Sequence, residues 1–166
     1  MKFSIVMMAY NQGRFIDEAI RSVISQNLSF TWELLIGDDA STDHTPDIVF
    51  GWLRQYPANI FYFRHKKNIG LHKNYQFLIE KSRGEYVALL EADDYWPDTD
   101  KSRLQVELMD AHPEMAYSFT NADTVDVNGK LLEQKTFELP RICDLDYFVN
   151  HFFIAPNNTV VFRKTA

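Results

Sequence analysis

Several features that define large protein classes are missing from this sequence of 166 residues. Its one cysteine, Cys143, excludes a disulfide within the chain and a paired-thiol zinc site, and it fits a reducing compartment. A membrane-spanning helix needs roughly 20 apolar residues, whereas the opening run FSIVMMAY has about eight, with no cleavage-site pattern after it. Low-complexity stretches, repeats and Gly/Ser linkers are also absent. These absences predict one compact domain in the cytoplasm.

An excess of positive charge is missing as well. The chain has 17 basic and 23 acidic residues, a net charge of -6 and a pI near 5.3, which is a poor footprint for binding a nucleic-acid backbone. Hydrophobic residues make up 46% of the sequence, enough for a substantial core. We therefore expect small ligands and no nucleic acid among its partners.

The sequence motifs of four common enzyme classes are also absent. No GxxxxGK[ST] loop accompanies the apolar-then-acidic stretch LLEADD, which excludes a P-loop nucleotide triphosphatase. The first strand leads into AYNQGR, with the single Gly13, where a Rossmann dehydrogenase requires GxGxxG. Five scattered histidines without an HxxxH pair, and no GxSxG, argue against zinc peptidases and serine hydrolases.

Hydrophobic periodicity predicts alternating strands and helices in the first half. Apolar runs of strand length recur between segments with helical spacing, and Thr45-Pro46 and Gly84 are expected to mark a helix start and a helix end. The predicted strands are 3–8, 32–36, 60–63 and 86–90, and the helices are 13–26, one from residue 45, and 71–82. Successive β-then-α units predict a parallel α/β sheet.

The second half predicts a mixed or antiparallel region. A helix ends near Pro113, and Asn128-Gly129 is a hairpin turn signal within DVNGKLL. The expected elements are a helix over 98–112, a strand over 115–119, the hairpin, a short helix near 144–151 and a strand over 159–162.

Polar side chains follow three of the predicted strands, where open α/β sheets bind ligands. Tyr10-Asn11, Asp38-Asp39 and the stretch 91–94 occupy these positions. Each of these groups also has an alternative interpretation without a ligand. Residues of the DDASTD stretch can simply form a turn and start a helix, and the acids of 91–94 can lie on a solvated surface turn. The functional interpretation of Asp93 and Asp94 is a divalent cation site, because Mg²⁺ and Mn²⁺ prefer carboxylate oxygens and neutralise their repulsion.

Four motifs in order, SIVMMAYNQGRFIDEAIRSVISQ, ELLIGDDASTDHT, NIG and SRGEYVALLEADDYWP, give the chain a specific family likeness. Over residues 3 to about 110 the chain resembles bacterial family 2 glycosyltransferases of the GT-A fold. HFFIAPNNTVVFRK resembles the continuation of that family with lower specificity. The resemblance implies a Rossmann-like, mostly parallel sheet flanked by helices in a single domain over 1–166. Residues 1–97 would bind the nucleotide-sugar, and 98–166 would begin an acceptor-binding half that continues past residue 166.

The resemblance also assigns nucleotide-binding roles. Tyr10 matches the aromatic residue that packs on the base, and Asp39 matches the residue that hydrogen-bonds the base. Asn68 and Gly70 match the NxG element beside the nucleotide, and Lys73 is expected to reach the ribose or a phosphate. Asp38 is expected to support its own turn.

In the DxD-like element Glu91-Ala92-Asp93, Asp93 matches the metal ligand, for Mn²⁺ or Mg²⁺. Glu91 stands where the family more often has aspartate, near the ribose and donor sugar, and Asp94 is expected to support Asp93. Ala40 replaces the usual glycine of DDGS, which predicts a backbone conformation there that tolerates a Cβ.

The implied activity is inverting, metal-assisted transfer from a nucleotide-diphosphate sugar, most often a UDP-sugar, to a hydroxyl of a glycan or lipid-linked saccharide, in surface polysaccharide or glycan synthesis. The general base is expected beyond residue 166, since Asp144 and Asp146 fit helix caps better. Peripheral association with the inner face of the plasma membrane through Phe152 and Phe153 is a further expectation, which competes with buried packing of these two side chains. Two different functions also stay open: a catalytically incomplete nucleotide-sugar-binding module, and an interaction domain without a ligand.

Overall fold

The computed structural model describes residues 1–135 and 156–164. The first half alternates strands and helices: β1 (Phe3–Ala9), α1 (Ile16–Ile24), β2 (Trp32–Asp38), α2 (Thr45–Gln55), β3 (Ile60–Arg64), α3 (Leu71–Lys81) and β4 (Tyr86–Glu91). Then follow α4 (Lys101–Ala111), β5 (Tyr117–Ser118), β6 (Ala122–Val125), β7 (Leu131–Lys135), the 3₁₀ turn η1 (Asn157–Thr159) and β8 (Val161–Arg163). The helix expected near 144–151 lies outside the described residues.

One six-stranded sheet in the order β3-β2-β1-β4-β8-β5 forms the centre of the molecule. β1 pairs in parallel with β2 and β4, and β2 pairs in parallel with β3. β8 runs antiparallel to both β4 and β5. The predicted α/β class, with a mostly parallel sheet and a mixed second half, is confirmed.

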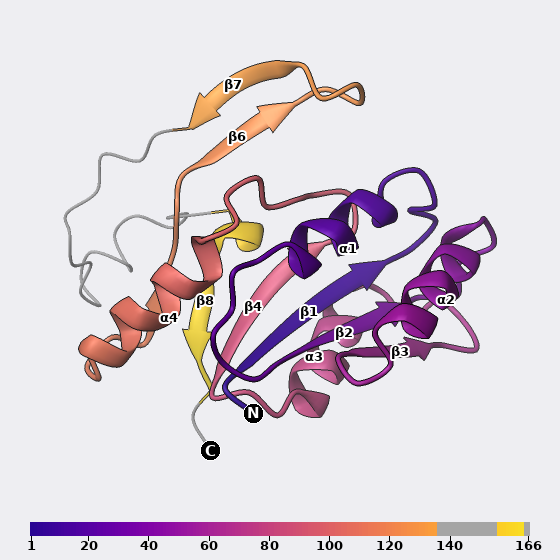
Figure 1. The fold of residues 1–166 in the computed structure, drawn as a ribbon. Coiled ribbons are helices and arrows are strands. Elements are labelled where there is room, and N and C mark those ends of the chain that lie inside the picture. Colours follow the sequence, from indigo (N-terminus) through magenta and orange to yellow (C-terminus); the bar gives the residue numbers. More distant parts are fainter. Residues whose placement is uncertain (136–155, 165–166) are drawn as a thin grey trace.

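Helices cover both faces of this sheet (Figure 1). Phe3, Ile5 and Met7 of β1 are buried in the core shared with α1, α2 and α4, whereas Val6 and Met8 join the smaller core under α3. Burial of β1 on both faces explains why its sequence is continuously apolar instead of alternating. The arrangement fits right-handed crossovers, which place α3 opposite α1 and α2 once the strand order reverses at β4.

Of the two predicted helix signals, Thr45-Pro46 does mark a helix start, since α2 begins at Thr45 with Pro46 in its first turn. Gly84 does not end α3, which stops at Lys81 and Ser82; instead a Cβ on Gly84 would lie 2.5 Å from the backbone nitrogen of Ser4. At the start of α2, the capping oxygen comes from Asp43, whose Oδ1 accepts the N–H of Thr45 (3.0 Å). The helices predicted over 13–26 and 98–112 are also shorter at both ends.

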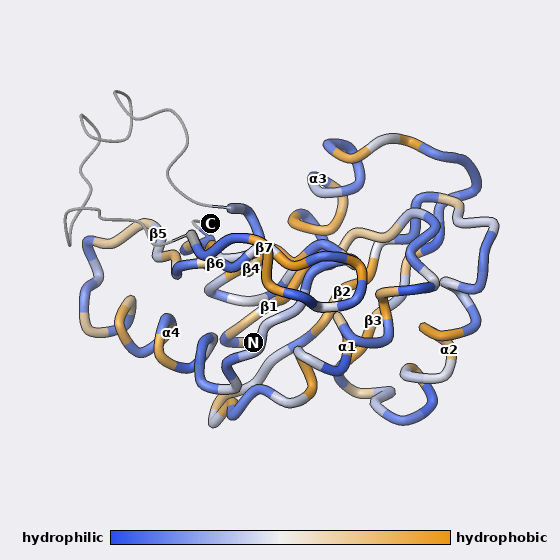
Figure 2. The backbone as a smooth tube through the Cα atoms, turned by 90° about the horizontal axis from the view of Figure 1, so that it is seen from above, coloured by the Kyte–Doolittle hydropathy of each residue, from blue (hydrophilic) through white to orange (hydrophobic). Residues whose placement is uncertain are grey.

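The expected hairpin is present as the separate two-stranded sheet β6-β7. Gly129 takes a positive φ of 79° in its turn, as the Asn-Gly signal predicts. Figure 2 shows the hairpin crossing over the main sheet when seen from above. Arg14, after β1, donates from Nη2 to the carbonyl of Val127 (3.0 Å). Among the helices of the described residues, none has the length and apolar character to cross a membrane.

Candidate functional site

A pocket of about 330 Å³ opens at the carboxyl ends of the parallel strands. β1 lies between β2 and β4, so the loops after β1 and β4 meet at the point where the strand order reverses. The lining residues are Met8, Ala9, Tyr10, Gln12, Asp39, Asn68, Gly70, Leu71, Asn74, Glu91 and Asp93. Six of the seven residues predicted to bind the nucleotide-sugar are therefore together, and Lys73 is the exception, exposed on the first turn of α3.

Hydrogen bonds join the loop after β1 to the loop after β2. The backbone N–H groups of Asn11, Gln12 and Gly13 donate to Ser41 Oγ (2.9 Å), Thr45 Oγ1 (2.9 Å) and Asp43 Oδ2 (2.8 Å). These contacts explain why the DDASTDHT stretch is so polar, and they give Ser41 and Asp43 a structural role.

Asp38 is fully buried at the end of β2. Its Oδ1 accepts the N–H of Ser41 (2.7 Å), and its Oδ2 accepts the Tyr62 hydroxyl and lies 3.6 Å from Arg64 Nε. Burial and the bond to Asp38 raise the pKa of Tyr62, so its hydroxyl stays protonated as a donor. This geometry agrees with the turn-supporting role expected of Asp38.

Asp39 holds the loop over residues 68–70 against the pocket. Its Oδ1 accepts the N–H of Ile69 (2.6 Å) and its Oδ2 accepts the N–H of Gly70 (2.9 Å), to which Asn68 Oδ1 is also close (3.1 Å). Gly70 has φ 86° and ψ 157°, a conformation open essentially to glycine alone. Asp39, Asn68 and Gly70 thus form one structural unit in the pocket wall.

The expectation that the backbone at Ala40 takes a conformation that tolerates a Cβ is wrong. Ala40 has φ 65°, in the left-handed region that disfavours a Cβ, so the replacement of glycine does not reflect a relaxed conformation.

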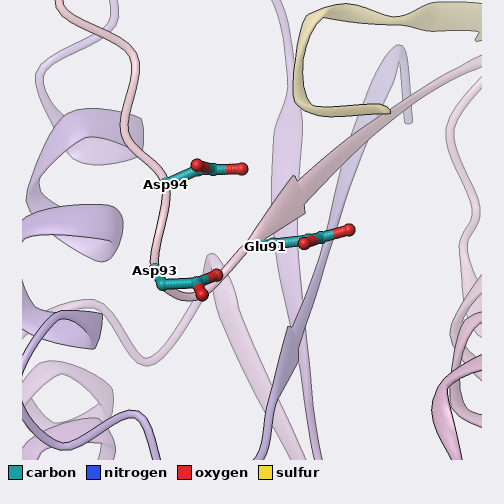
Figure 3. Close-up of side chains that lie close together, drawn as sticks. All are labelled: Glu91, Asp93 and Asp94. Atoms are coloured by element: carbon teal, nitrogen blue, oxygen red, sulfur yellow. The ribbon is translucent and has the colours of Figure 1, made fainter. Parts of the chain in front are cut away.

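Three carboxylates converge at the end of β4 (Figure 3). One oxygen from each of Glu91, Asp93 and Asp94 lies within 4.8 Å of the others. Figure 3 shows Glu91 at the tip of the strand and the two aspartates on the loop after it, with all three side chains extending to the same side. Burial, then the charges of Asp93 and Glu91, raise the pKa of Asp94 to about 6, although a hydrogen bond from Asn158 lowers it.

The cluster fits a divalent cation in its donor chemistry. Three hard oxygen donors converge, and no ion pair between these carboxylates and a basic side chain is found within residues 1–135 and 156–164. Asp93, the exposed member of the cluster, lines the pocket and is the residue that would hold such an ion, with its neighbour Asp94 in support.

Several site residues escaped sequence reasoning. Gln12 Nε2 lies 3.4 Å from Asp93 Oδ2, and the Tyr75 hydroxyl lies 3.4 Å from Glu91 Oε1. Asn74 is buried under the pocket and donates to the carbonyl of Gly37 (2.8 Å). Asn158 reaches Asp94 from η1, far along the chain. Gln12 and Asn158 lie within stretches that carry the family resemblance, but the resemblance assigns no role to either of them or to Asn74 and Tyr75.

The model of the family described as "Glycosyl transferase family 2" matches residues 4–165. The chain belongs to glycosyl transferase family 2. An uncharacterized protein of Mycobacterium tuberculosis is 37% identical over 162 residues, which are 97% of this chain and 46% of that protein. A Bacillus subtilis protein, provisionally named a teichuronic acid biosynthesis glycosyltransferase, is 32% identical over 136 residues, covering 79% of this chain and 50% of that one.

Solved structures of glycosyltransferases share the GT-A fold of this family 2 chain. Residues 1–349 of TarS from S. aureus, in complex with UDP, superpose with a TM-score of 0.78 at 24% identity, over 98% of this chain and 47% of that fragment. The mannosyltransferase PcManGT from Pyrobaculum calidifontis, in complex with GDP-Man and Mn²⁺, gives 0.72 at 18% identity, over 98% and 44%. The family 2 chain spans about half the length of the curated relatives it matches.

Proposed function

We propose that this chain is the donor-binding part of a metal-dependent, inverting glycosyltransferase that uses a nucleotide-diphosphate sugar, with a UDP-sugar as the first candidate. The observation that carries the proposal is the convergence of Glu91, Asp93 and Asp94 beside a pocket that Tyr10 and Asp39 also line. In this proposal residues 1–97 bind the donor, and residues 98–166 begin the acceptor-binding half of a single domain.

The pocket offers each part of such a donor a matching group. Tyr10, 50% exposed at the rim, presents an aromatic face on which a base can stack. Asp39 fixes the 68–70 loop and keeps lone pairs for a donor group of the base. Glu91, with Tyr75 beside Oε1, has its second oxygen to accept hydroxyls of the ribose or sugar.

A divalent cation bound at Asp93 supplies the positive charge that stabilises a diphosphate leaving group. Asp93 would provide the ligand oxygen, Asp94 would support it, and Gln12 would hold the second Asp93 oxygen in place. The complexes with UDP, and with GDP-Man and Mn²⁺, among proteins of the same fold favour this assignment.

Inversion requires a general base on the face of the sugar opposite the diphosphate. The carboxylates lining the described pocket are Asp39, Glu91 and Asp93, all on the donor side, and Asp144 and Asp146 lie outside the described residues. We therefore assign the base to none of the residues that the structure describes. A glycan or lipid-linked saccharide is the proposed acceptor, in surface polysaccharide synthesis, as the name of the Bacillus subtilis relative suggests for that protein.

Calorimetry with UDP in the presence and absence of Mn²⁺ tests the donor and metal assignments. Wild type should bind UDP more tightly with Mn²⁺, and Asp93→Ala should lose at least about tenfold in that affinity. Asp123→Ala, which removes an exposed carboxylate on β6, is the matched control and should bind like wild type. Undiminished binding by Asp93→Ala would reject the metal role.

A second candidate function is a nucleotide-sugar-binding module without turnover. It is favoured by the span of the chain, about half of its relatives, together with the lack of an assigned base. Assays of UDP-sugar hydrolysis and transfer with the same protein separate the two: binding without release of UDP supports the module.

A further inference from the structure

A long stretch of this acidic chain contains no carboxylate. Between Asp47 and Glu80 there is no Asp or Glu, although the chain has 23 acidic residues. The stretch holds five basic residues, so its formal charge is +5. The rest of the chain carries a formal charge of -11, and the two together give the net charge of -6. These five are Arg54, Arg64, Lys66, Lys67 and Lys73, which we call the basic edge.

The fold gathers this stretch at one side of the molecule. It forms most of α2, all of β3 and most of α3, and β3 is the outermost strand of the six-stranded sheet. Figure 1 shows β3 and α2 at the end of the sheet away from α4 and β8. The charge asymmetry of the sequence is therefore also an asymmetry in space.

The three lysines of the basic edge have no anionic partner in the described part of the chain. Lys66, Lys67 and Lys73 are exposed, and no ion pair within residues 1–135 and 156–164 includes them. Other basic residues are neutralised, as Lys2 is by Glu85 (3.0 Å) and Arg83 by Glu33. Charges left unpaired in this way are available to an external anion.

Two large apolar side chains accompany these cations. Leu71, directly between the lysines in sequence, is 54% exposed, and Phe50 on α2 is 47% exposed. Phe50 makes an edge contact with Tyr62 of β3 (5.4 Å between centroids). Exposed Leu and Phe among lysines are typical of surfaces that enter the headgroup region of a bilayer.

We propose that the basic edge, with Phe50 and Leu71, docks on an anionic lipid bilayer. A flat membrane touches only the protruding end of the protein, and the Debye length of about 8 Å at physiological salt screens the acidic remainder. A long, flexible polyanion such as RNA would also meet the acidic surface, and this face offers Phe50 as its exposed aromatic residue, which is too little to stack successive bases. Leu71 also lines the donor pocket and Lys73 is expected to reach the donor, so the docking face adjoins that pocket, although docking itself requires no transferase activity.

Co-sedimentation of the full chain with vesicles tests the docking. Vesicles of phosphatidylcholine with roughly 30% phosphatidylglycerol are compared with vesicles of pure phosphatidylcholine. The anionic lipid gives the first kind a negative surface potential. Wild type should bind the anionic vesicles and release them as NaCl is raised. Lys66→Glu with Lys67→Glu should weaken the partition by about tenfold or more, since each lysine near the surface contributes.

The matched control reverses two exposed lysines outside the basic edge, Lys81→Glu with Lys130→Glu, and should bind nearly as well as wild type. Phe50→Ser should weaken binding while leaving its salt dependence unchanged. Equal binding to both vesicle types, equal loss in the control pair, or binding to a polyuridine RNA without binding to vesicles would overturn the proposal. Unchanged urea midpoints establish that each variant is folded.

Discussion

Ala40, which directly follows Asp38 and Asp39, is held in a left-handed backbone conformation with φ 65°. A Cβ in that region costs roughly 1–2 kcal/mol, whereas glycine adopts it freely. Ala40→Gly should therefore raise the free energy of unfolding by about 0.5–1 kcal/mol after the extra unfolded-state entropy of glycine is subtracted. Urea denaturation measures the change.

The control for this prediction is Ala116→Gly, at an exposed alanine with an ordinary negative φ. There glycine adds flexibility without relieving strain, so stability should fall by up to about 1 kcal/mol. Equal losses in both variants would show that Ala40 is not strained.

Lys101, the first residue of α4, is buried without a carboxylate partner in the part of the chain that the structure describes. Its ammonium lies 4.2 Å from the Trp96 ring centroid and donates to Gln105 Oε1 (2.7 Å). Burial lowers the pKa of Lys101 to about 7 from 10.5. The folded protein therefore holds this charge at a cost at neutral and acidic pH.

We predict that Lys101→Met is more stable than wild type at pH 6 by about 1–2 kcal/mol, even though Gln105 loses a donor. Between pH 7 and pH 10 the unfolded wild-type chain binds more protons at this site than the folded one, so wild-type stability rises with pH and the difference shrinks. Urea titrations at pH 6, 8 and 10 follow this trend. A gap that stays constant with pH would contradict it, and exposed Lys130→Met is the neutral control.

At the level of elements, hydrophobic periodicity predicted the type and order of the strands and helices up to α4. It succeeded because the sheet buries β1, β2 and β4 almost completely, so their apolar runs stand out. Ends were predicted less well, because tertiary contacts set them. Gly84 is required by Ser4, 80 residues away, and Gly37 by Asn74, whose Oδ1 would lie 2.3 Å from an added Cβ.

The carboxyl end of α3 depends on such a distant contact. Lys164, just after β8, donates from Nζ to the carbonyls of Ile79 (2.9 Å) and Ser82 (2.6 Å). Its positive charge also lies at the negative end of the helix dipole, where it is stabilising. Lys164→Ala should lower the free energy of unfolding by about 1–2 kcal/mol, because the charged hydrogen bonds to both carbonyls are lost and, among the described residues, only that of Ile79 keeps another donor, the Ser82 hydroxyl (2.7 Å).

Urea denaturation measures this loss, and hydrogen exchange should show faster exchange in the last turn of α3. Lys130→Ala, at an exposed hairpin lysine, should change neither. A Lys164→Ala variant with wild-type stability would mean that solvent satisfies the carbonyls equally well.

At the level of the whole molecule, the sequence predicted which loops would meet but not how they would be held. Residues in motifs at strand ends, such as Tyr10, Asp39 and Asp93, were identifiable because topology brings all parallel strand ends to one edge. Gln12 and Asn158 were not, because their position beside the acidic cluster depends on the folded path of the chain. Sequence motifs therefore located the site, whereas the groups that hold its carboxylates in place emerged only from the fold.

The hairpin β6-β7 is a second unit whose stability we expect to differ from that of the main sheet. In the described residues its strands pair only with each other, Leu131 and Leu132 are 48% and 63% exposed, and Arg14 bonds its turn to the body at Val127. Low burial and solvent-exposed backbone bonds permit local opening without global unfolding. Amides of β6 and β7 should therefore exchange far faster than those of β1 and β4, and with little dependence on urea.

Arg14→Ala should increase exchange in the hairpin further while leaving β1 and β4 unchanged, because it removes a contact between the two units and none within the main sheet. Arg21→Ala, which removes an exposed arginine of α1 that pairs with Asp17, is the control and should leave hairpin exchange as it is. If hairpin and sheet amides instead exchanged at one rate with the same urea dependence, the chain would unfold as a single cooperative unit, and the hairpin would belong energetically to the main sheet.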